Sequence, residues 1–345
     1  MIHKFTLLEN LLLRFNIIPH PVVDALNHVI AGRGLQVSVN IGIFDALEKN
    51  PKNVMEIAKS TNSNPEGISA LLPCLKALGY VGEINSGKFI LTKKGKRFLS
   101  KDSEFSLNNT ILFSDYVFGS LNDLEENVKR GGPKNVNLDV FTQRQWGIFN
   151  NTMIEVAKTN AKEIANLIPL SKGYKRLLDI GGSHGLHAIE ICKKVPGLSA
   201  EVLDLKPVEQ FAKKTIKNYK MIDRVKFRVG DLLKDDFGKN YDVILAFNMI
   251  HGFSPEMNYK LTEKVYRALN SDGIYVILDQ IKDAGGNSEL SKLVSSTMGL
   301  MLFNVAGGRT YSFEEVSAWI SKGGFKNIEL KKLRSPGNAL IIGYK

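Results

Sequence analysis

Two acidic residues flank a glycine-rich segment at positions where they could bind a nucleoside. The short run Leu177-Leu178-Asp179-Ile180 ends at Gly181-Gly182-Ser183-His184-Gly185. Glycines at such a turn let the chain reverse sharply and let a ligand approach the backbone without a Cβ in the way. Asp204 ends the next apolar run, 204 − 185 = 19 residues after the last glycine. This spacing is near the roughly 20 residues typical of an acid that binds ribose hydroxyls, so it predicts a ribose-containing ligand.

The glycine pattern separates two classes of such ligands. A dinucleotide fingerprint needs Gly-x-Gly-x-x-Gly, but Ser183 and Leu186 occupy the second and third glycine positions counted from Gly181. A carboxylate at Asp179 would repel a pyrophosphate and attract a cationic amino group. The pattern therefore favours S-adenosylmethionine, and an ordinary strand-to-helix turn without a ligand is the alternative.

Two further segments place polar residues directly after predicted strands. Gly230-Asp231-Leu232 follows residues 225–229, so Asp231 could accept a hydrogen bond from an adenine amino group while Leu232 covers the ring; a surface turn is the alternative. His251 follows the apolar run 241–248. Because imidazole titrates near the operating pH, His251 is the best candidate for a general base, and a polar pocket residue without a catalytic role is the alternative.

Alternating strands and helices must position these residues. Predicted strands cover 177–180, 200–204, 225–229, 241–248 and 273–279, with helices after the first, second and fourth of them and a later helix over 313–322. Residues 328–333 and 339–343 form a closing hairpin through Ser335-Pro336-Gly337-Asn338. Such a hairpin is foreign to dinucleotide folds and typical of the seven-stranded methyltransferase sheet. The sequence therefore predicts an α/β, Rossmann-like class I methyltransferase domain.

The N-terminal third has a different pattern. Asn53-Val54-Met55-Glu56 predicts a capped helix, Asn64-Pro65 opens another, and residues 80–84 and 88–91 form a hairpin around Asn85-Ser86-Gly87. This order predicts a winged helix. Apolar residues between Pro21 and Glu48 exceed what one small domain needs, which indicates an interface.

A winged helix also raises the alternative of a DNA-binding regulator. The helix that would read bases offers Glu66, Gly67, Ser69, Ala70 and Pro73 with a single Lys76, whereas base-reading faces carry Arg, Lys, Asn or Gln. We therefore expect no nucleic-acid partner.

Composition bounds the remaining possibilities. The chain has 345 residues, 43% of them hydrophobic, with a formal net charge of +11 that is spread along its length. The two cysteines, Cys74 and Cys192, lie in predicted helices, so they indicate neither a disulfide framework nor a metal cluster. The N-terminal apolar run is interrupted by charge, and no run approaches membrane-spanning length. We expect a cytoplasmic protein without a membrane partner.

From about residue 20 onward the chain resembles the dimeric S-adenosylmethionine-dependent small-molecule O-methyltransferases, a family of plant caffeate-type and bacterial pigment and antibiotic enzymes. The resemblance rests on the winged-helix-like start and on the joint spacing of Asp179-Ile-Gly-Gly, Leu203-Asp204-Leu205, Gly230-Asp231-Leu232, His251 and Gly307-Gly308-Arg309-Thr310. It implies a dimerisation domain over 1–105 and a catalytic domain over 106–345. Within the latter, 106–165 would line the acceptor pocket and 166–345 would bind the cofactor.

The resemblance also implies roles for individual residues. His251 would be the catalytic base and Asp279 its supporting acid, while the acceptor would meet Phe113, Phe149 and Met153. The chain departs from the family where Gly252 and Phe253 replace Asp-Trp, and where Gly308 replaces a second supporting acid. No metal is implied. The predicted cofactor-binding residues are Asp179, Gly181, Gly182, Ser183, Gly185, Asp204, Leu205, Gly230, Asp231, Leu232, Phe247 and Asn248.

Together these features predict a homodimeric enzyme of secondary metabolism. It would transfer a methyl group from S-adenosylmethionine to a hydroxyl of a small aromatic or polycyclic metabolite. Two other reactions stay open: methylation of carbon, and a decarboxylase, hydroxylase or cyclase of the same architecture that binds the cofactor without net methyl transfer.

Overall fold

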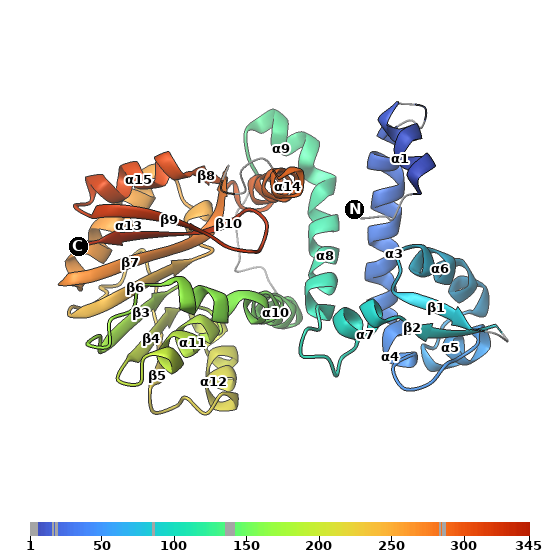
Figure 1. Cartoon of the computed structure of the whole chain (residues 1–345), viewed down its shortest axis with the longest axis horizontal. Coiled ribbons are helices and arrows are strands. Elements are labelled where there is room, and N and C mark those ends of the chain that lie inside the picture. Colours follow the sequence, from blue (N-terminus) through green and yellow to red (C-terminus); the bar gives the residue numbers. More distant parts are fainter. Residues whose placement is uncertain are drawn as a thin grey trace. The chain divides into compact units, whose positions relative to one another are not determined.

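The computed structural model describes residues 6–15, 17, 20–84, 87–134, 142–282, 284 and 288–345 (Figure 1). The chain divides into two compact units, Met1–Tyr116 and Val117–Lys345. The division falls inside the continuous helix α8 (Asn108–Ser120). The boundary at 105/106 that the sequence predicts lies in the loop before this helix. That predicted boundary stays a prediction.

The first unit is a helical domain that ends in a small hairpin. Its core packs α4 (Ile43–Ala46), α5 (Val54–Ser60) and α6 (Pro65–Ala77) against β1 (Val81–Ile84) and β2 (Lys88–Leu91), which pair antiparallel. Helix α7 (Lys93–Leu99) follows the hairpin. The order of helices and hairpin confirms the predicted winged-helix arrangement, although Asn85 and Ser86 of the predicted turn lie outside the described residues.

Local sequence signals explain where helix α5 begins. The Asn53 side-chain oxygen accepts a hydrogen bond from the Glu56 N–H at 2.9 Å, and the Glu56 carboxylate accepts one from the Asn53 N–H at 2.8 Å. This reciprocal pair satisfies two backbone donors that a helix start leaves without partners.

The N-terminal helices of this unit bury only part of their apolar surface. They are α1 (Leu7–Arg14), α2 (His20–Val22), η1 (Val23–Asn27) and α3 (His28–Ile41). Leu26, Val29 and Ile30 are 55%, 54% and 59% exposed, whereas Ile43 and Phe44 are buried in the core. The apolar surplus in the sequence therefore divides between a core and a surface.

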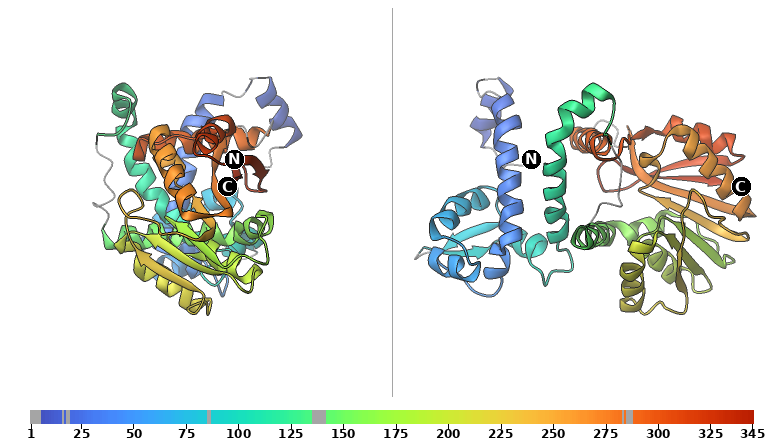
Figure 2. Two further views of the ribbon diagram at one scale, coloured as in Figure 1. Left: turned by 90° about the vertical axis from the view of Figure 1, so that its left-hand side faces the viewer. Right: turned by 180° about the vertical axis from the view of Figure 1, so that it is seen from behind.

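The second unit is built on one twisted sheet in the strand order β5-β4-β3-β6-β7-β10-β9 (Figures 1 and 2). Strand β10 is antiparallel to both neighbours, and the first five strands of this order are parallel. This is the predicted methyltransferase topology. The strands are β3 (Arg176–Ile180), β4 (Ser199–Asp204), β5 (Val225–Val229), β6 (Tyr241–Phe247), β7 (Leu269–Lys282), β9 (Lys326–Lys332) and β10 (Asn338–Tyr344).

Two features of the sheet were not predicted. A two-residue strand, β8 (Tyr311–Ser312), pairs with the end of β7 and brings the sheet to eight strands. Strand β7 also begins at Leu269, four residues before the predicted start, and its register against β6 shifts after Leu269, which pairs with Tyr241, whereas Ile274 pairs with Val243.

Helices cover both faces of this sheet because alternate strand residues point to opposite sides. One apolar cluster contains Leu177, Val243 and Val276 together with residues of α10 (Gln143–Leu167), α11 (Leu186–Lys194) and α12 (Glu209–Asn218). The other contains Leu178, Ile244 and Ile277 with residues of α13 (Pro255–Ala268) and α15 (Phe313–Lys322).

The sheet has a topological switch point between β3 and β6. From β3 the chain proceeds to β4 and β5 on one side and then returns to β6 on the other. Ligands of open α/β sheets bind outside the carboxyl ends of the strands at such a point. The predicted cofactor-binding residues and His251 lie at the ends of β3, β4, β5 and β6. Among the described residues, no helix has the length and apolar character needed to cross a membrane.

Candidate active site

The turn after β3 requires glycine at several positions. Gly181 and Gly185 adopt φ values of +63° and +72°, and Ser183 also lies in the left-handed region at +46°. A Cβ on Gly182 would overlap the carboxylate of Asp179, and one on Gly181 would overlap the side chain of Met249. The glycines therefore allow both a tight turn and a close approach of backbone to side chains.

Asp179 is a buried acid without a hydrogen-bond donor in the described structure. Its side chain is 1% exposed, and neither carboxylate oxygen has a partner. Burial, and next the nearby charge of Asp204, raise the pKa of Asp179 to about 8. Since buried polar groups in folded proteins almost always have partners, the two oxygens fit a cationic donor supplied by a ligand. The amino group of S-adenosylmethionine is such a donor.

Asp204 is held at the end of β4 by backbone donors. Its Oδ2 accepts a hydrogen bond from the Ser183 N–H at 2.8 Å, and its Oδ1 accepts one from the Leu205 N–H at 2.7 Å. Burial raises the pKa of Asp204, although these two hydrogen bonds act against it. The glycine turn and the predicted ribose-binding acid thus form one rigid group, and the ribose contact itself stays a prediction.

The third predicted acid also contacts its own loop. Asp231 accepts a hydrogen bond from the Leu233 N–H at 2.9 Å, which lowers the pKa of this carboxyl, and its Oδ2 lies 3.1 Å from Lys234 Nζ. The Gly230 N–H donates to the Asp204 carbonyl at 3.0 Å, so the loop is joined to the end of β4. Leu232 is half-buried against the core.

The end of β6 contributes two more residues of the predicted cofactor site. Phe247 is buried, whereas Asn248 is exposed and adopts φ +54°. The Asn248 N–H donates to the Leu278 carbonyl at 2.7 Å. This bond fixes the backbone that leads from β6 to His251.

His251 pairs with Asp279, as the resemblance implies. The His251 Nδ1 atom lies 2.7 Å from Asp279 Oδ1, and the carboxylate is fully buried and also accepts the Gln280 N–H at 2.8 Å. Burial acts to lower the pKa of His251, but the charge and hydrogen bond of Asp279 outweigh it, so this pKa lies above its ordinary value. The pair therefore stabilises an imidazolium and orients the ring.

The backbone around His251 is held by the segment that contains Gly308 and Arg309. The Arg309 N–H donates to the His251 carbonyl at 2.9 Å, and a Cβ on Gly308 would overlap that same carbonyl. On α13, the buried Asn258 donates from Nδ2 to the Ile250 carbonyl at 3.0 Å. At Gly308, the position where the resembled family has its second supporting acid, the structure leaves no room for a side chain.

The predicted acceptor residues belong to different units. Phe149 and Met153 lie on α10 in the second unit and are half-buried, whereas Phe113 lies on α8 in the first unit, where its ring stacks on Tyr116 at 5.7 Å between centroids. A common acceptor pocket therefore stays a prediction.

Two site residues were not found from the sequence. Asn150 is fully buried on α10 and accepts a hydrogen bond from the Ser183 hydroxyl at 3.1 Å. His184 is buried, its Nδ1 accepts the Leu186 N–H at 3.0 Å, and burial lowers its pKa to about 4 although a hydrogen bond with the Met153 backbone opposes this. Both residues join the glycine turn to α10, a contact that no sequence spacing indicates.

The first prediction concerns the charge of Asp179. Because its pKa is raised in the folded protein, the folded state holds a proton that the unfolded state releases above pH 3.8, so stability falls as pH rises from about 4 to about 8. Asp179→Asn removes this loss. The cofactor-free variant should therefore unfold at a higher temperature than wild type, by a margin that grows over that range and levels off above pH 8.

The same variant should bind the cofactor product less well. Asp179→Asn is expected to weaken S-adenosylhomocysteine binding by about 1.5–3 kcal/mol, the contribution of a hydrogen bond to a charged group. Titration calorimetry in buffers of different ionisation enthalpy should show proton release on binding to wild type near neutral pH and none for the variant. Equal affinities would contradict the assignment of Asp179.

A second prediction separates two neighbouring glycines. Gly308→Ala should lower the free energy of unfolding by about 1–3 kcal/mol, because the new Cβ must displace the His251 backbone. The matched control is Gly252→Ala, where the Cβ meets no atom within 4 Å and the change should stay within about 0.5 kcal/mol. Denaturant unfolding of both variants measures the difference, and equal effects would rule out the close approach at Gly308.

Comparisons with known proteins agree with this geometry. Residues 137–326, more than half of the chain, match the family model described as an O-methyltransferase domain. A 3-hydroxy-5-methyl-1-naphthoate 3-O-methyltransferase from Streptomyces sahachiroi is 23% identical over 90% of this chain and 91% of its own length. An L-tyrosine C(3)-methyltransferase from Streptomyces lavendulae is 24% identical over 90% of this chain and 88% of its own.

A solved structure shows the same fold over the whole chain. Human N-acetylserotonin methyltransferase, in complex with S-adenosylmethionine, superposes with a TM-score of 0.84 at 19% identity and covers 100% of this chain and 99% of its own. The fold and the family match together confirm the predicted class of enzyme and its cofactor. The chain belongs to the S-adenosylmethionine-dependent small-molecule O-methyltransferase family.

Proposed function

We propose that this O-methyltransferase uses His251 as a general base towards a hydroxyl group of a small aromatic or polycyclic metabolite. The observation that carries the proposal is the His251–Asp279 pair, 2.7 Å between Nδ1 and Oδ1, at the carboxyl edge of the sheet next to the acids of the cofactor site. The naphthoate substrate in the name of one relative supports an aromatic acceptor.

Different residues of the chain would bind the cofactor and transfer the proton. S-adenosylmethionine supplies a methyl group on a positively charged sulfur. Asp179 and Asp204 would bind its amino and ribose groups, and Asp231 its adenine. With Nδ1–H donated to Asp279, the Nε2 atom of His251 keeps a lone pair that can take the proton of an acceptor hydroxyl. Asp279 then stabilises the imidazolium.

One observation favours a second candidate, methylation of carbon. The relative from Streptomyces lavendulae is named as a C(3)-methyltransferase of L-tyrosine, so the architecture is compatible with a phenol ring methylated at carbon. The same base would serve in both reactions, since removing the phenolic proton activates oxygen and ring carbon alike. The position of the new methyl group in the product distinguishes the two.

The third prediction tests the base. His251→Ala should lower the single-turnover rate of methyl transfer by about 10²–10⁴-fold, the usual contribution of positioned proton transfer, with cofactor affinity nearly unchanged. In wild type the rate should rise with pH through a value above 6.5, because only neutral His251 accepts a proton and Asp279 raises its pKa.

Two comparisons make this test specific. The deficit of His251→Ala should shrink as pH approaches the pKa of the acceptor, which then ionises unaided. Asp279→Asn should show part of the deficit, because the amide orients the ring without stabilising its charge. Wild-type turnover in His251→Ala would contradict base catalysis and leave positioning as the mechanism.

We further propose that the protein acts as a homodimer in the cytoplasm, with residues 1–105 forming the interface. The exposed apolar side chains of Leu26, Val29 and Ile30 on η1 and α3 support this proposal, because contiguous apolar surface on a helix usually marks a contact with another protein. A second copy is the partner implied by the resemblance, and both free cysteines suit a reducing compartment.

The fourth prediction tests the dimer. Wild type should sediment as a dimer, and the double variant Val29→Asp, Ile30→Asp should sediment as a monomer because it places charges in an apolar contact. Met55→Asp is the control, since Met55 is an apolar side chain on α5 that is 65% exposed. A monomeric wild type, or a double variant that stays dimeric, would refute the proposed interface.

A further inference from the structure

The loop over residues 230–238, here named the adenine loop, connects β5 to β6 and carries Asp231 and Leu232. Irregular loops must satisfy their backbone carbonyls outside helices and strands. In this loop four carbonyls, those of Leu232, Asp235, Asp236 and Phe237, accept hydrogen bonds from two cationic side chains.

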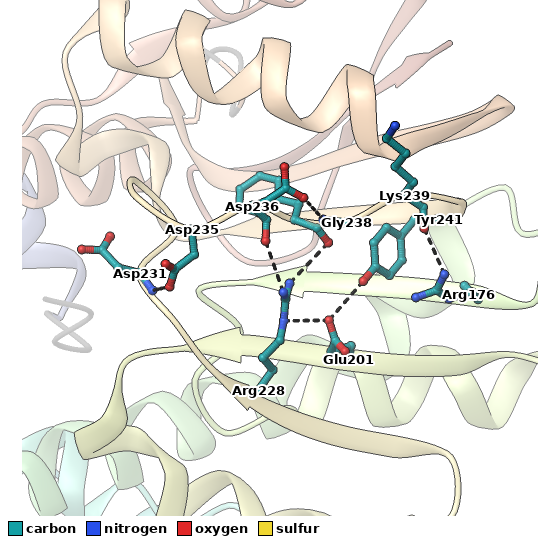
Figure 3. Close-up of polar contacts among 10 residues, drawn as sticks. Arg176, Glu201, Arg228, Asp231, Asp235, Asp236, Gly238, Lys239 and Tyr241 are labelled. Carbon is teal, nitrogen blue, oxygen red and sulfur yellow. Dashed lines mark hydrogen bonds and ion pairs between the residues drawn. The ribbon is translucent and has the colours of Figure 1, made fainter.

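The first of these cations is Arg228 at the end of β5. Its Nη1 and Nη2 donate to the carbonyls of Asp236 and Phe237 at 3.2 and 3.3 Å, as Figure 3 shows. Its Nε lies 2.9 Å from Glu201 on β4, and the Tyr241 hydroxyl donates to the same Glu201 oxygen at 3.0 Å (Figure 3). The guanidinium is therefore fixed by two neighbouring strands.

The second cation is Lys264 on α13. Its Nζ donates to the carbonyls of Leu232 and Asp235 at 2.7 and 2.6 Å and lies 4.2 Å from the centre of the Phe237 ring. Burial lowers the pKa of Lys264, while the neighbouring Asp236, Asp235 and Asp231 oppose this. The ammonium thus joins two positions of the adenine loop, Leu232 and Asp235, to one helix.

Hydrogen bonds inside the loop connect Asp235, which Lys264 binds, to Asp231. The Asp235 carboxylate accepts the Asp231 N–H at 2.7 Å, and the Asp235 N–H donates back to the Asp231 carbonyl at 2.7 Å. Lys264 binds the carbonyl of Leu232, which follows Asp231 in the chain, and the carbonyl of Asp235 itself. Moving Lys264 would therefore move the backbone that carries the acid.

We propose that Lys264 and Arg228 are positioning residues that hold the adenine loop so that Asp231 and Leu232 can bind the adenine of the cofactor. This inference rests on the proposed cofactor contacts. Hydrogen bonds from two cations, one on β5 and one on α13, order an exposed loop before the ligand arrives, so less of the binding free energy is spent on ordering it. The effect should appear in adenine recognition, not in the chemical step.

The test compares two ligands that differ only in the base. S-adenosylhomocysteine presents an amino group to Asp231, whereas S-inosylhomocysteine presents a carbonyl oxygen that a carboxylate repels. Wild type should therefore prefer the adenine ligand. Lys264→Met matches the lysine side chain as far as the ε carbon and removes the ammonium, so it should weaken S-adenosylhomocysteine binding about tenfold, the scale of one hydrogen bond to a charged group. Binding of the inosine ligand should change little.

The control is Lys260→Met on the same helix, because Lys260 is exposed and pairs with Glu256 at 2.7 Å. It should leave both affinities at the wild-type values. Arg228→Gln is the second variant and should reduce the preference for adenine in the same direction. Combining Lys264→Met with Asp231→Ala should add little to the loss from Asp231→Ala alone, because both act through one contact.

Calorimetry with folded variants, checked by their unfolding temperatures, decides among the outcomes. An unchanged preference in both Lys264→Met and Arg228→Gln would overturn the proposal, and so would an equal weakening of both ligands, since that reports a general disturbance. A wild type that does not bind S-adenosylhomocysteine, or that does not distinguish the bases, would instead refute the cofactor contacts on which the inference rests.

Discussion

The buried carboxylate of Asp179 is the constraint on which the rest of the site depends. Enclosing an acid without a donor costs free energy, and the protein reduces that cost by keeping the group protonated until its pKa of about 8. Asp204 adds to the cost because its charge lies nearby. A ligand with a cationic group removes the penalty, so an arrangement that by itself costs free energy becomes a source of affinity and selectivity.

Helix α13 joins the two parts of the site that must act together. Through Asn258 it holds the Ile250 carbonyl beside His251, and through Lys264 it holds the Leu232 carbonyl of the adenine loop. His251 and the adenine loop are therefore both held by hydrogen bonds from the same helix. Catalysis by positioning requires that the reacting groups be placed accurately relative to one another. A helix that holds both segments explains how residues on loops can be placed with this accuracy.

The sequence predicts those features that depend on local rules. The glycine turn, the acids at strand ends and the closing hairpin follow from turn chemistry and from the alternation of apolar residues, and the structure has them at the expected residues. The pairing of His251 with Asp279 came from the resemblance, because a separation of 28 residues carries no geometric information by itself.

Local sequence rules do not predict the tertiary contacts. The bonds of Asn150 with Ser183 and of Lys264 with Leu232 join elements that meet only when helices pack on the sheet. The close approach of Gly308 to His251 is of the same kind. From sequence the glycine was only a missing acid, whereas in the fold it is the residue that lets two backbone segments touch.

The most direct test of the central claim follows the methyl group itself. The enzyme would be incubated with S-adenosylmethionine carrying a ¹³C-labelled methyl and a metabolite extract, and the labelled product would be examined by nuclear magnetic resonance. The account predicts a labelled methyl bonded to oxygen in an aromatic product, together with S-adenosylhomocysteine. A label bonded to ring carbon, or a product formed while the cofactor keeps its label, would contradict it.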